Sequence, residues 1–142
     1  MNKMNKMNKN LKIVQIGCGV VGGSYLKAFK ARDYNITVID INQETIDFYN
    51  NKYKIPCYNT TNIPNNLKAD LIMISVQTPL KNDNTELKLD YLFSTLKTVS
   101  KLVKNNTIIL IRSTVKPGTT RKYKLQLEKL LGHKKFHLGF NP

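Results

Sequence analysis

Lys12-Ile-Val-Gln-Ile-Gly17-Cys-Gly19-Val-Val-Gly22-Gly23 is the stretch that decides the fold. An apolar run of strand type ends abruptly at a Gly-x-Gly-x-x-Gly spacing, and a helical pattern follows, which is the context in which this spacing binds a dinucleotide. Gly17 lets the chain turn sharply off the strand, Gly19 leaves room for a pyrophosphate against the backbone, and Gly22 lets the helix lie close to the sheet. The free N–H groups and the positive dipole end of that helix then face the phosphates. Gly17, Gly19 and Gly22 are therefore predicted to surround a bound pyrophosphate.

An acid completes this fingerprint about 20 residues further along the chain. Ile36-Thr-Val-Ile-Asp40 has the pattern of a strand that ends in a carboxylate. Asp40 would accept hydrogen bonds from the hydroxyls of an adenosine ribose and repel a 2′-phosphate, so we expect NAD rather than NADP as the cofactor. The alternative is a glycine-rich turn that binds nothing, and the combination of strand, helix and acid argues against it.

Strands and helices alternate along the remaining chain. Short apolar runs predict strands at residues 11–16, 36–39, 56–58, 71–76, 107–111 and 136–140. Helical spacing of apolar residues predicts three helices, with a fourth near 120–131. The apolar face of the first consists of Val21, Tyr25, Ala28 and Phe29. The second, after an Asn42 N-cap, has Ile46, Tyr49 and Tyr53, and the third has Leu89, Leu92, Leu96, Val99 and Val103. The alternation predicts an α/β fold of the Rossmann type, a single domain over residues 11–142 whose doubly wound parallel sheet has about six strands. Residues 1–10, with Met-Asn-Lys three times over, are predicted to be a disordered low-complexity tail.

Composition excludes several classes of protein. The 142 residues, 41% of them hydrophobic, suit one domain with a real core. No apolar run approaches the roughly 20 residues that a membrane span needs, and the charged N-terminus has no apolar segment behind it that would make a secretory signal. We therefore expect a cytoplasmic protein with reduced thiols and no membrane partner.

The cysteines and histidines form no recognisable reactive or metal-binding pattern. Cys18 is interpreted as a small filler of the glycine turn rather than a nucleophile, and Cys57 has no paired partner in spacing. His133 and His137 are four residues apart, which suits a metal only on a helix. Gly132 and the apolar run that follows predict a turn into a strand instead, so we expect no metal site.

A net charge of +14 is large enough to attract nucleic acid. Lysine is scattered along the chain beside asparagine, and no basic and aromatic motif of nucleic-acid binding accompanies it. We favour solvated faces over a nucleic-acid partner. A basic cluster near the C-terminus consists of Arg121, Lys122, Lys124, Lys129, Lys134 and Lys135.

Six motifs follow one another in the order and spacing of one known family. They are Gly17-Cys-Gly-Val-Val-Gly22, Asp40-Ile-Asn42, Val76-Gln-Thr-Pro79, Leu89-Asp90-Tyr91, Ser113-Thr-Val-Lys-Pro-Gly-Thr-Thr120 and Asn141-Pro142. Together they resemble the N-terminal domain of the UDP-glucose/GDP-mannose dehydrogenases, over essentially the whole chain from Leu11.

This resemblance implies the NAD-binding domain of an enzyme that oxidises C6 of a nucleotide sugar to a carboxylate, in two hydride transfers through a cysteine-bound intermediate. It implies that the pyrophosphate lies against Gly17, Cys18, Gly19, Val20, Val21 and Gly22. It places the rest of the cofactor along two segments at strand ends. Their residues are Val76, Gln77, Thr78, Pro79, Ser113, Thr114 and Val115. The hydroxyl of Thr114 is implied to form a hydrogen bond near the reacting centre, as the catalytic residue of this part. Ordinary turn chemistry is the alternative for both segments.

Three departures from the family pattern bear on function. Thr45 stands where many members carry a cation, Gln77 is bulkier than the usual residue before Thr-Pro, and the sequence ends at Pro142, before the family's sugar-binding domain and its catalytic Cys, Lys and Asn. We therefore expect a truncated or split member that binds NAD and is inactive alone. Two alternatives are a non-catalytic NAD-binding regulatory module that pairs with a separate chain carrying the sugar-binding domain, and a basic protein that binds nucleic acid while keeping the fold.

Overall fold

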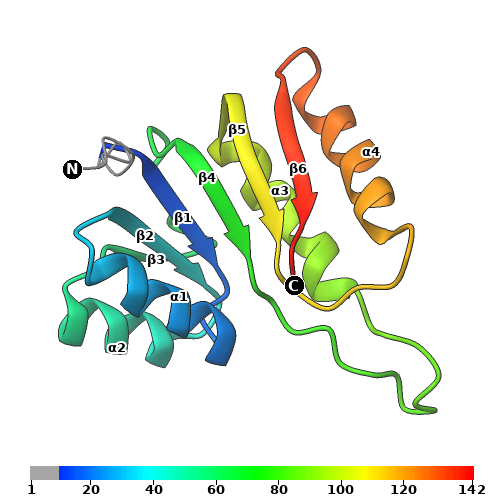
Figure 1. The fold of residues 1–142 in the computed structure, drawn as a ribbon, viewed down its shortest axis with the longest axis horizontal. Coiled ribbons are helices and arrows are strands. Elements are labelled where there is room, and N and C mark those ends of the chain that lie inside the picture. Colours follow the sequence, from blue (N-terminus) through cyan, green and yellow to red (C-terminus); the bar gives the residue numbers. More distant parts are fainter. Residues whose placement is uncertain (1–9) are drawn as a thin grey trace, which may run out of the picture.

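Parallel strands in the order β3-β2-β1-β4-β5-β6 form the sheet of the computed structural model, which describes residues 10–142 (Figure 1). The strands are β1 (Lys12–Ile16), β2 (Asn35–Asp40), β3 (Cys57–Asn59), β4 (Ala69–Ile74), β5 (Val103–Ile111) and β6 (Phe136–Phe140). The helices are α1 (Val20–Lys30), α2 (Gln43–Tyr53), α3 (Asp90–Leu102) and α4 (Thr119–Leu131). The predicted Rossmann-type fold and its six-stranded parallel sheet are confirmed.

Strand order reverses beside β1, the first strand of the chain. Ile13 of β1 pairs with Ile36 of β2 on one side and with Leu71 of β4 on the other. The chain therefore winds outward from β1 through β2 to β3, and then in the opposite direction from β4 to β6. In a doubly wound sheet the crevice at this reversal point, outside the carboxyl ends of the strands, is where ligands bind.

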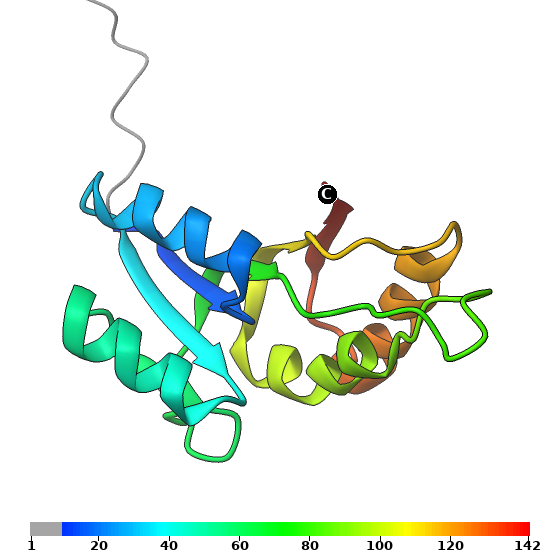
Figure 2. The same ribbon diagram turned by 90° about the horizontal axis from the view of Figure 1, so that it is seen from below.

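The helices cover opposite faces because parallel crossovers are right-handed. Figure 2 shows α1 on one side of the sheet and α3 on the other. One buried cluster joins α1 and α2 to the sheet through Leu26, Tyr49 and Met73. The other joins α3 and α4 to it through residues such as Leu96 and Tyr123. Burial on both faces explains why the central strands are apolar throughout.

Three sequence predictions about local structure were wrong in detail. Val21 is 51% exposed, because the face of α1 that packs on the sheet is formed by Gly22, Gly23 and Leu26. Val103 is buried but begins β5 instead of ending the helix before it, since its backbone is extended (φ −71°, ψ 131°). The strand expected at 71–76 is shifted toward the N-terminus by two residues, so its last two predicted members belong to the segment after β4.

Residues 1–9 of the predicted disordered tail lie outside the described residues, and Asn10 is in a turn. Within residues 10–142, no helix is both long and apolar enough to pass through a membrane.

Candidate functional site

The turn between β1 and α1 is fixed by contacts that only glycine permits. Gly17 has a φ of +82°, and a Cβ there would lie 2.6 Å from the carbonyl oxygen of Ser75. A Cβ on Gly22 would overlap the carbonyl oxygen of Gly17. A Cβ on Gly19, by contrast, would have no atom of residues 10–142 within 4 Å. The turn is thus tightly packed at Gly17 and Gly22 and open at Gly19.

Two residues that the sequence analysis did not select support this turn. Gln15 is fully buried in β1, and its Nε2 donates a hydrogen bond of 2.9 Å to the carbonyl oxygen of Gly17. Gly23 packs against the hydroxyl of Tyr49, where a Cβ would clash. A glutamine inside an otherwise apolar strand, directly before the glycines, is the sequence feature that singles out Gln15.

Asp40 ties the end of β2 to the glycine turn. Its Oδ2 accepts a hydrogen bond of 2.8 Å from the backbone N–H of Cys18, and its Oδ1 accepts one of 2.9 Å from the N–H of Asn42. Asn42 in turn caps α2 by accepting from the N–H of Thr45. The predicted acid and the predicted phosphate turn are therefore in direct contact, although they are 22 residues apart in sequence.

The segments that follow β4 and β5 are joined by two hydrogen bonds. Thr78 Oγ1 donates to the carbonyl oxygen of Thr114 at 2.7 Å, and Ser113 Oγ donates to that of Val76 at 2.7 Å. The side chain of Thr114 is exposed, and its hydroxyl makes no hydrogen bond to residues 10–142. Two of the three hydroxyls thus hold the segments together, while the third is available to a ligand.

A cavity of about 320 Å³ lies at the carboxyl ends of β1, β2 and β4. Its walls include six predicted cofactor residues, namely Gly17, Cys18, Gly19, Asp40, Val76 and Gln77. The other predicted residues, Val20, Val21, Gly22, Thr78, Pro79, Ser113, Thr114 and Val115, do not line it. The wall on the α3 side, which the sequence analysis missed, consists of Tyr91, Ser94, Thr95 and Thr98. Those four residues are spaced as one helix face, but only the packing of α3 directs that face toward the glycine turn.

The thiol in the wall of this cavity, that of Cys18, stays protonated at neutral pH. The pKa of Cys18 is raised to about 12, mainly by burial; a hydrogen bond with Tyr49 opposes this rise and the nearby Asp40 carboxylate adds to it. Burial likewise raises the pKa of Cys57, which does not line the cavity, to about 11. Among residues 10–142, no three His, Cys, Asp or Glu side chains come together as a possible metal site.

Comparison with known families identifies the group of proteins to which this architecture belongs. The family model of the NAD binding domain of the UDP-glucose/GDP-mannose dehydrogenase family matches residues 58–142, which is more than half of the chain. The chain belongs to that family. The matched part begins after the glycine turn, so it includes the segments around Thr78 and Thr114 but not the turn itself.

Members of the UDP-glucose/GDP-mannose dehydrogenase family are also among the relatives found by sequence. The UDP-N-acetyl-D-mannosamine dehydrogenase of Campylobacter jejuni is 30% identical over 94% of this chain and 35% of its own length. The GDP-mannose 6-dehydrogenase of Pseudomonas savastanoi pv. phaseolicola is 30% identical over 93% of this chain and 36% of its own. The chain thus spans about a third of the length of these relatives.

A solved structure gives the same picture of the fold. The GDP-mannose dehydrogenase of Pseudomonas aeruginosa, determined as a ternary complex, superposes with a TM-score of 0.78 at 22% identity, over 92% of this chain and 35% of that one. At this identity the likeness establishes the fold alone. Together with the family match, it confirms the prediction of an NAD-binding Rossmann domain.

Proposed function

We propose that this chain holds NAD along the carboxyl edge of the sheet, with the diphosphate at the glycine turn. The observation that carries this proposal is the open space at Gly19, at the start of α1, where no atom of the described residues would lie within 4 Å of an added Cβ. No side chain in the described part of the chain caps the first turn of α1, and no acid occurs in that turn. Free N–H groups at a helix N-terminus bind phosphate oxygens well.

Asp40 is proposed to bind the adenosine ribose. Each of its carboxylate oxygens accepts one backbone N–H, which leaves further lone pairs for the ribose hydroxyls in the cavity that Asp40 lines. A ribose 2′-phosphate would instead meet a negative charge at this position, so the site is expected to prefer NAD to NADP.

The exposed hydroxyl of Thr114 is proposed to act near the nicotinamide end. NAD, when bound, supplies the acceptor for a hydride. The contribution of the chain is geometric, because the bonds from Thr78 and Ser113 fix the two strand-end segments relative to each other. Positioning of this kind is a large part of how a hydride donor and its acceptor are brought into reaction.

We further propose that the domain serves the oxidation of a nucleotide sugar and that the sugar is bound by residues outside it. The relatives that are named for this reaction extend well beyond the aligned third of their length. Within the cavity, Cys18 is buried and its raised pKa keeps it protonated, so it is a poor nucleophile. Residues 1–142 alone are therefore expected to bind NAD without oxidising UDP-glucose.

Calorimetric titration of the full chain with NAD and with NADP tests these proposals. We expect NAD to bind at least tenfold more tightly, and Asp40→Asn to reduce that preference because the repelling charge is lost. Asp47→Asn removes the same charge from an exposed position of α2 outside the cavity, and should leave the preference unchanged. Absence of heat with NAD, or an undiminished preference for NAD in Asp40→Asn, would refute the cofactor assignment. The expected inactivity is a separate point, and NADH formation from UDP-glucose by the wild-type chain would refute it.

A further inference from the structure

A second cavity, of about 490 Å³, lies between the segment that precedes α3 and the start of α4. Figure 1 shows that segment leaving β4 and reaching away from the sheet before α3 begins. The cavity shares no lining residue with the cavity at the glycine turn. It is therefore a separate place at which a ligand can bind.

The N-terminus of α4 opens into this second cavity. The helix has 13 residues, and its N-cap, Gly118, has a φ of 86° and offers no side chain to the first turn. No acid occurs in that turn. The N–H groups of Thr120 and Arg121 have no hydrogen-bond acceptor within residues 10–142, so two donors at the positive end of the helix dipole remain unused.

The buried hydroxyl of Thr119 is an independent sign of a missing ligand. Thr119 lines the cavity and is only 4% exposed, yet its Oγ1 has no hydrogen-bond partner among residues 10–142. Buried hydroxyls in folded proteins are almost always paired, and an unpaired one requires an explanation. An acceptor atom bound in the cavity would provide the partner.

The charge of the cavity walls selects an anion as that ligand. The lining residues include four lysines and two acids, a formal balance of +2, and they are Lys81, Lys88, Lys116, Lys122, Glu86 and Asp90. Lys81 and Glu86 form an ion pair at 2.5 Å and so neutralise each other. Lys122 forms no ion pair within residues 10–142, and its Nζ lies 5.4 Å from the centre of the Phe93 ring, which is also part of the wall.

We propose that this second cavity binds a phosphate group, either inorganic phosphate or the phosphate of a small ester. The free N–H groups of α4 and the Thr119 hydroxyl donate to the phosphate oxygens, and the ammonium groups of Lys116 and Lys122 balance its charge. The cavity is larger than a single phosphate requires, which leaves room for the organic part of an ester.

Amide resonances of the ¹⁵N-labelled full chain, recorded during titrations at constant ionic strength, test this inference. Inorganic phosphate and glycerol 3-phosphate are the two probes, with chloride replaced as either is added. We expect saturable shifts of the Thr119, Thr120 and Arg121 amides, with the tighter-binding probe showing which form of phosphate the cavity prefers. If phosphate shifts only the amides of the glycine turn, or shifts those of α4 without saturation, the second site does not exist.

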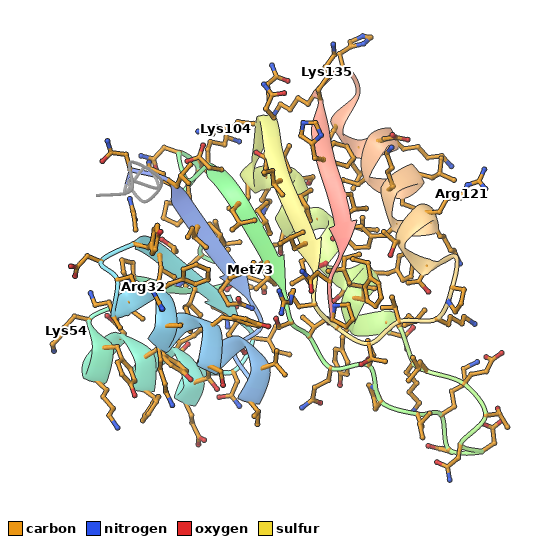
Figure 3. All side chains as sticks on the ribbon, viewed as in Figure 1. Arg32, Lys54, Met73, Lys104, Arg121 and Lys135 are labelled. Atoms are coloured by element: carbon orange, nitrogen blue, oxygen red, sulfur yellow. The ribbon has the colours of Figure 1, made fainter. Side chains whose placement is uncertain are left out.

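Variants separate specific binding from a general effect of positive charge. Lys116→Gln combined with Lys122→Gln should weaken phosphate binding about tenfold or more. Arg121→Gln is the matched control, because the Arg121 side chain points outward from α4 (Figure 3) and does not line the cavity, so it should change the affinity less than twofold. Equal effects of the lysine and arginine substitutions would overturn the proposal.

The hydroxyl of Thr119 is tested separately. Thr119→Val should weaken binding several-fold, and Thr119→Ser should restore it. If Thr119→Val does not fold, two other results decide the question. Wild-type phosphate affinity in Thr119→Ser, together with loss of phosphate binding in the lysine variants, supports the site. Wild-type phosphate affinity in the lysine variants refutes it. NAD titrations of the same variants should remain at the wild-type value, since the two cavities share no residue.

Discussion

Substitution of alanine at Gly22 and at Gly19 should separate the two tasks of the glycine turn. At Gly22 the new methyl overlaps the carbonyl oxygen of Gly17 and lies 3.0 Å from Gln15 Nε2. The Gly17 peptide cannot move aside freely, because its N–H donates to the carbonyl oxygen of Ile39 at 2.9 Å and its own carbonyl accepts from Gln15. The methyl must therefore displace α1 from the sheet.

The magnitudes of two opposing effects decide the sign at Gly22. Overpacking of this kind costs about 1–3 kcal/mol and sometimes more, whereas alanine in place of glycine within a helix gains about 1 kcal/mol. Because the methyl meets backbone rather than a flexible side chain, we expect the cost to lie at the upper end of its range, about 3 kcal/mol. It then exceeds the gain by about 2 kcal/mol, which lowers the Tm by about 4–8 °C for a chain of this size.

At Gly19 the expectation is the reverse. The backbone there is at φ −69° and ψ −157°, which alanine can adopt, and the methyl meets no atom of the residues that the structure describes. The loss of stability should be about 0.5–1 kcal/mol, the usual cost of alanine as an N-cap. The methyl occupies the space assigned to the diphosphate, so NAD affinity should fall at least tenfold.

Thermal melts followed by circular dichroism, together with calorimetry, distinguish these outcomes. A Gly22→Ala protein that melts at or above the wild-type temperature would show that the packing argument is wrong. A Gly19→Ala protein that binds NAD within twofold of wild type would show that the diphosphate does not approach the backbone at this point.

Three other predictions concern residues of the core, the sheet and the turn. Tyr123→Phe removes the buried hydroxyl that lies 2.8 Å from Thr95 Oγ1, and should lower the free energy of unfolding in urea by about 1 kcal/mol; an unchanged midpoint would contradict this. A hydrogen bond from Lys104 lowers the pKa of Asp70 from its ordinary value of 3.8. The contribution of the Asp70 carboxylate to folding stability is therefore present above about pH 4 and is lost as the pH falls through the lowered pKa. On acid titration, Asp70→Asn should lose stability less steeply than the wild-type chain. Burial raises the pKa of Cys18 to about 12. Iodoacetamide at pH 8 should therefore modify Cys18 at least a hundredfold more slowly in the folded chain than in urea. Comparable rates of modification would refute the burial of Cys18.

Local patterns were sufficient to predict most of the fold. The glycine spacing and the acid after β2 predicted two sides of the cavity, because both lie next to strand ends that are visible as apolar runs. The approach of α3 to the turn could not be predicted, since it depends on how α3 packs against the sheet rather than on its own sequence. The end of α3 at Leu102 was missed for a related reason: Val103 continues the apolar spacing, and only its pairing with Ala69 of β4 places it in a strand.

The predicted basic cluster is also divided by the fold. Lys122 lies on α4 at the carboxyl edge of the sheet. Lys135 lies at the amino edge, near Lys104 (Figure 3). Charges that are close in sequence thus belong to opposite ends of the molecule.

The contact between Asp40 and Cys18 has a consequence for how cofactor preference can change in evolution or by engineering. On the proposed ribose role of Asp40, admitting a 2′-phosphate means removing its charge, and the two N–H groups that it accepts limit how this can be done. Asparagine would keep only one acceptor oxygen for the Cys18 and Asn42 N–H groups, and a residue without a side-chain acceptor would leave both unpaired and loosen the phosphate turn. A conversion from NAD to NADP through such a residue would therefore require a second change that supplies a new acceptor.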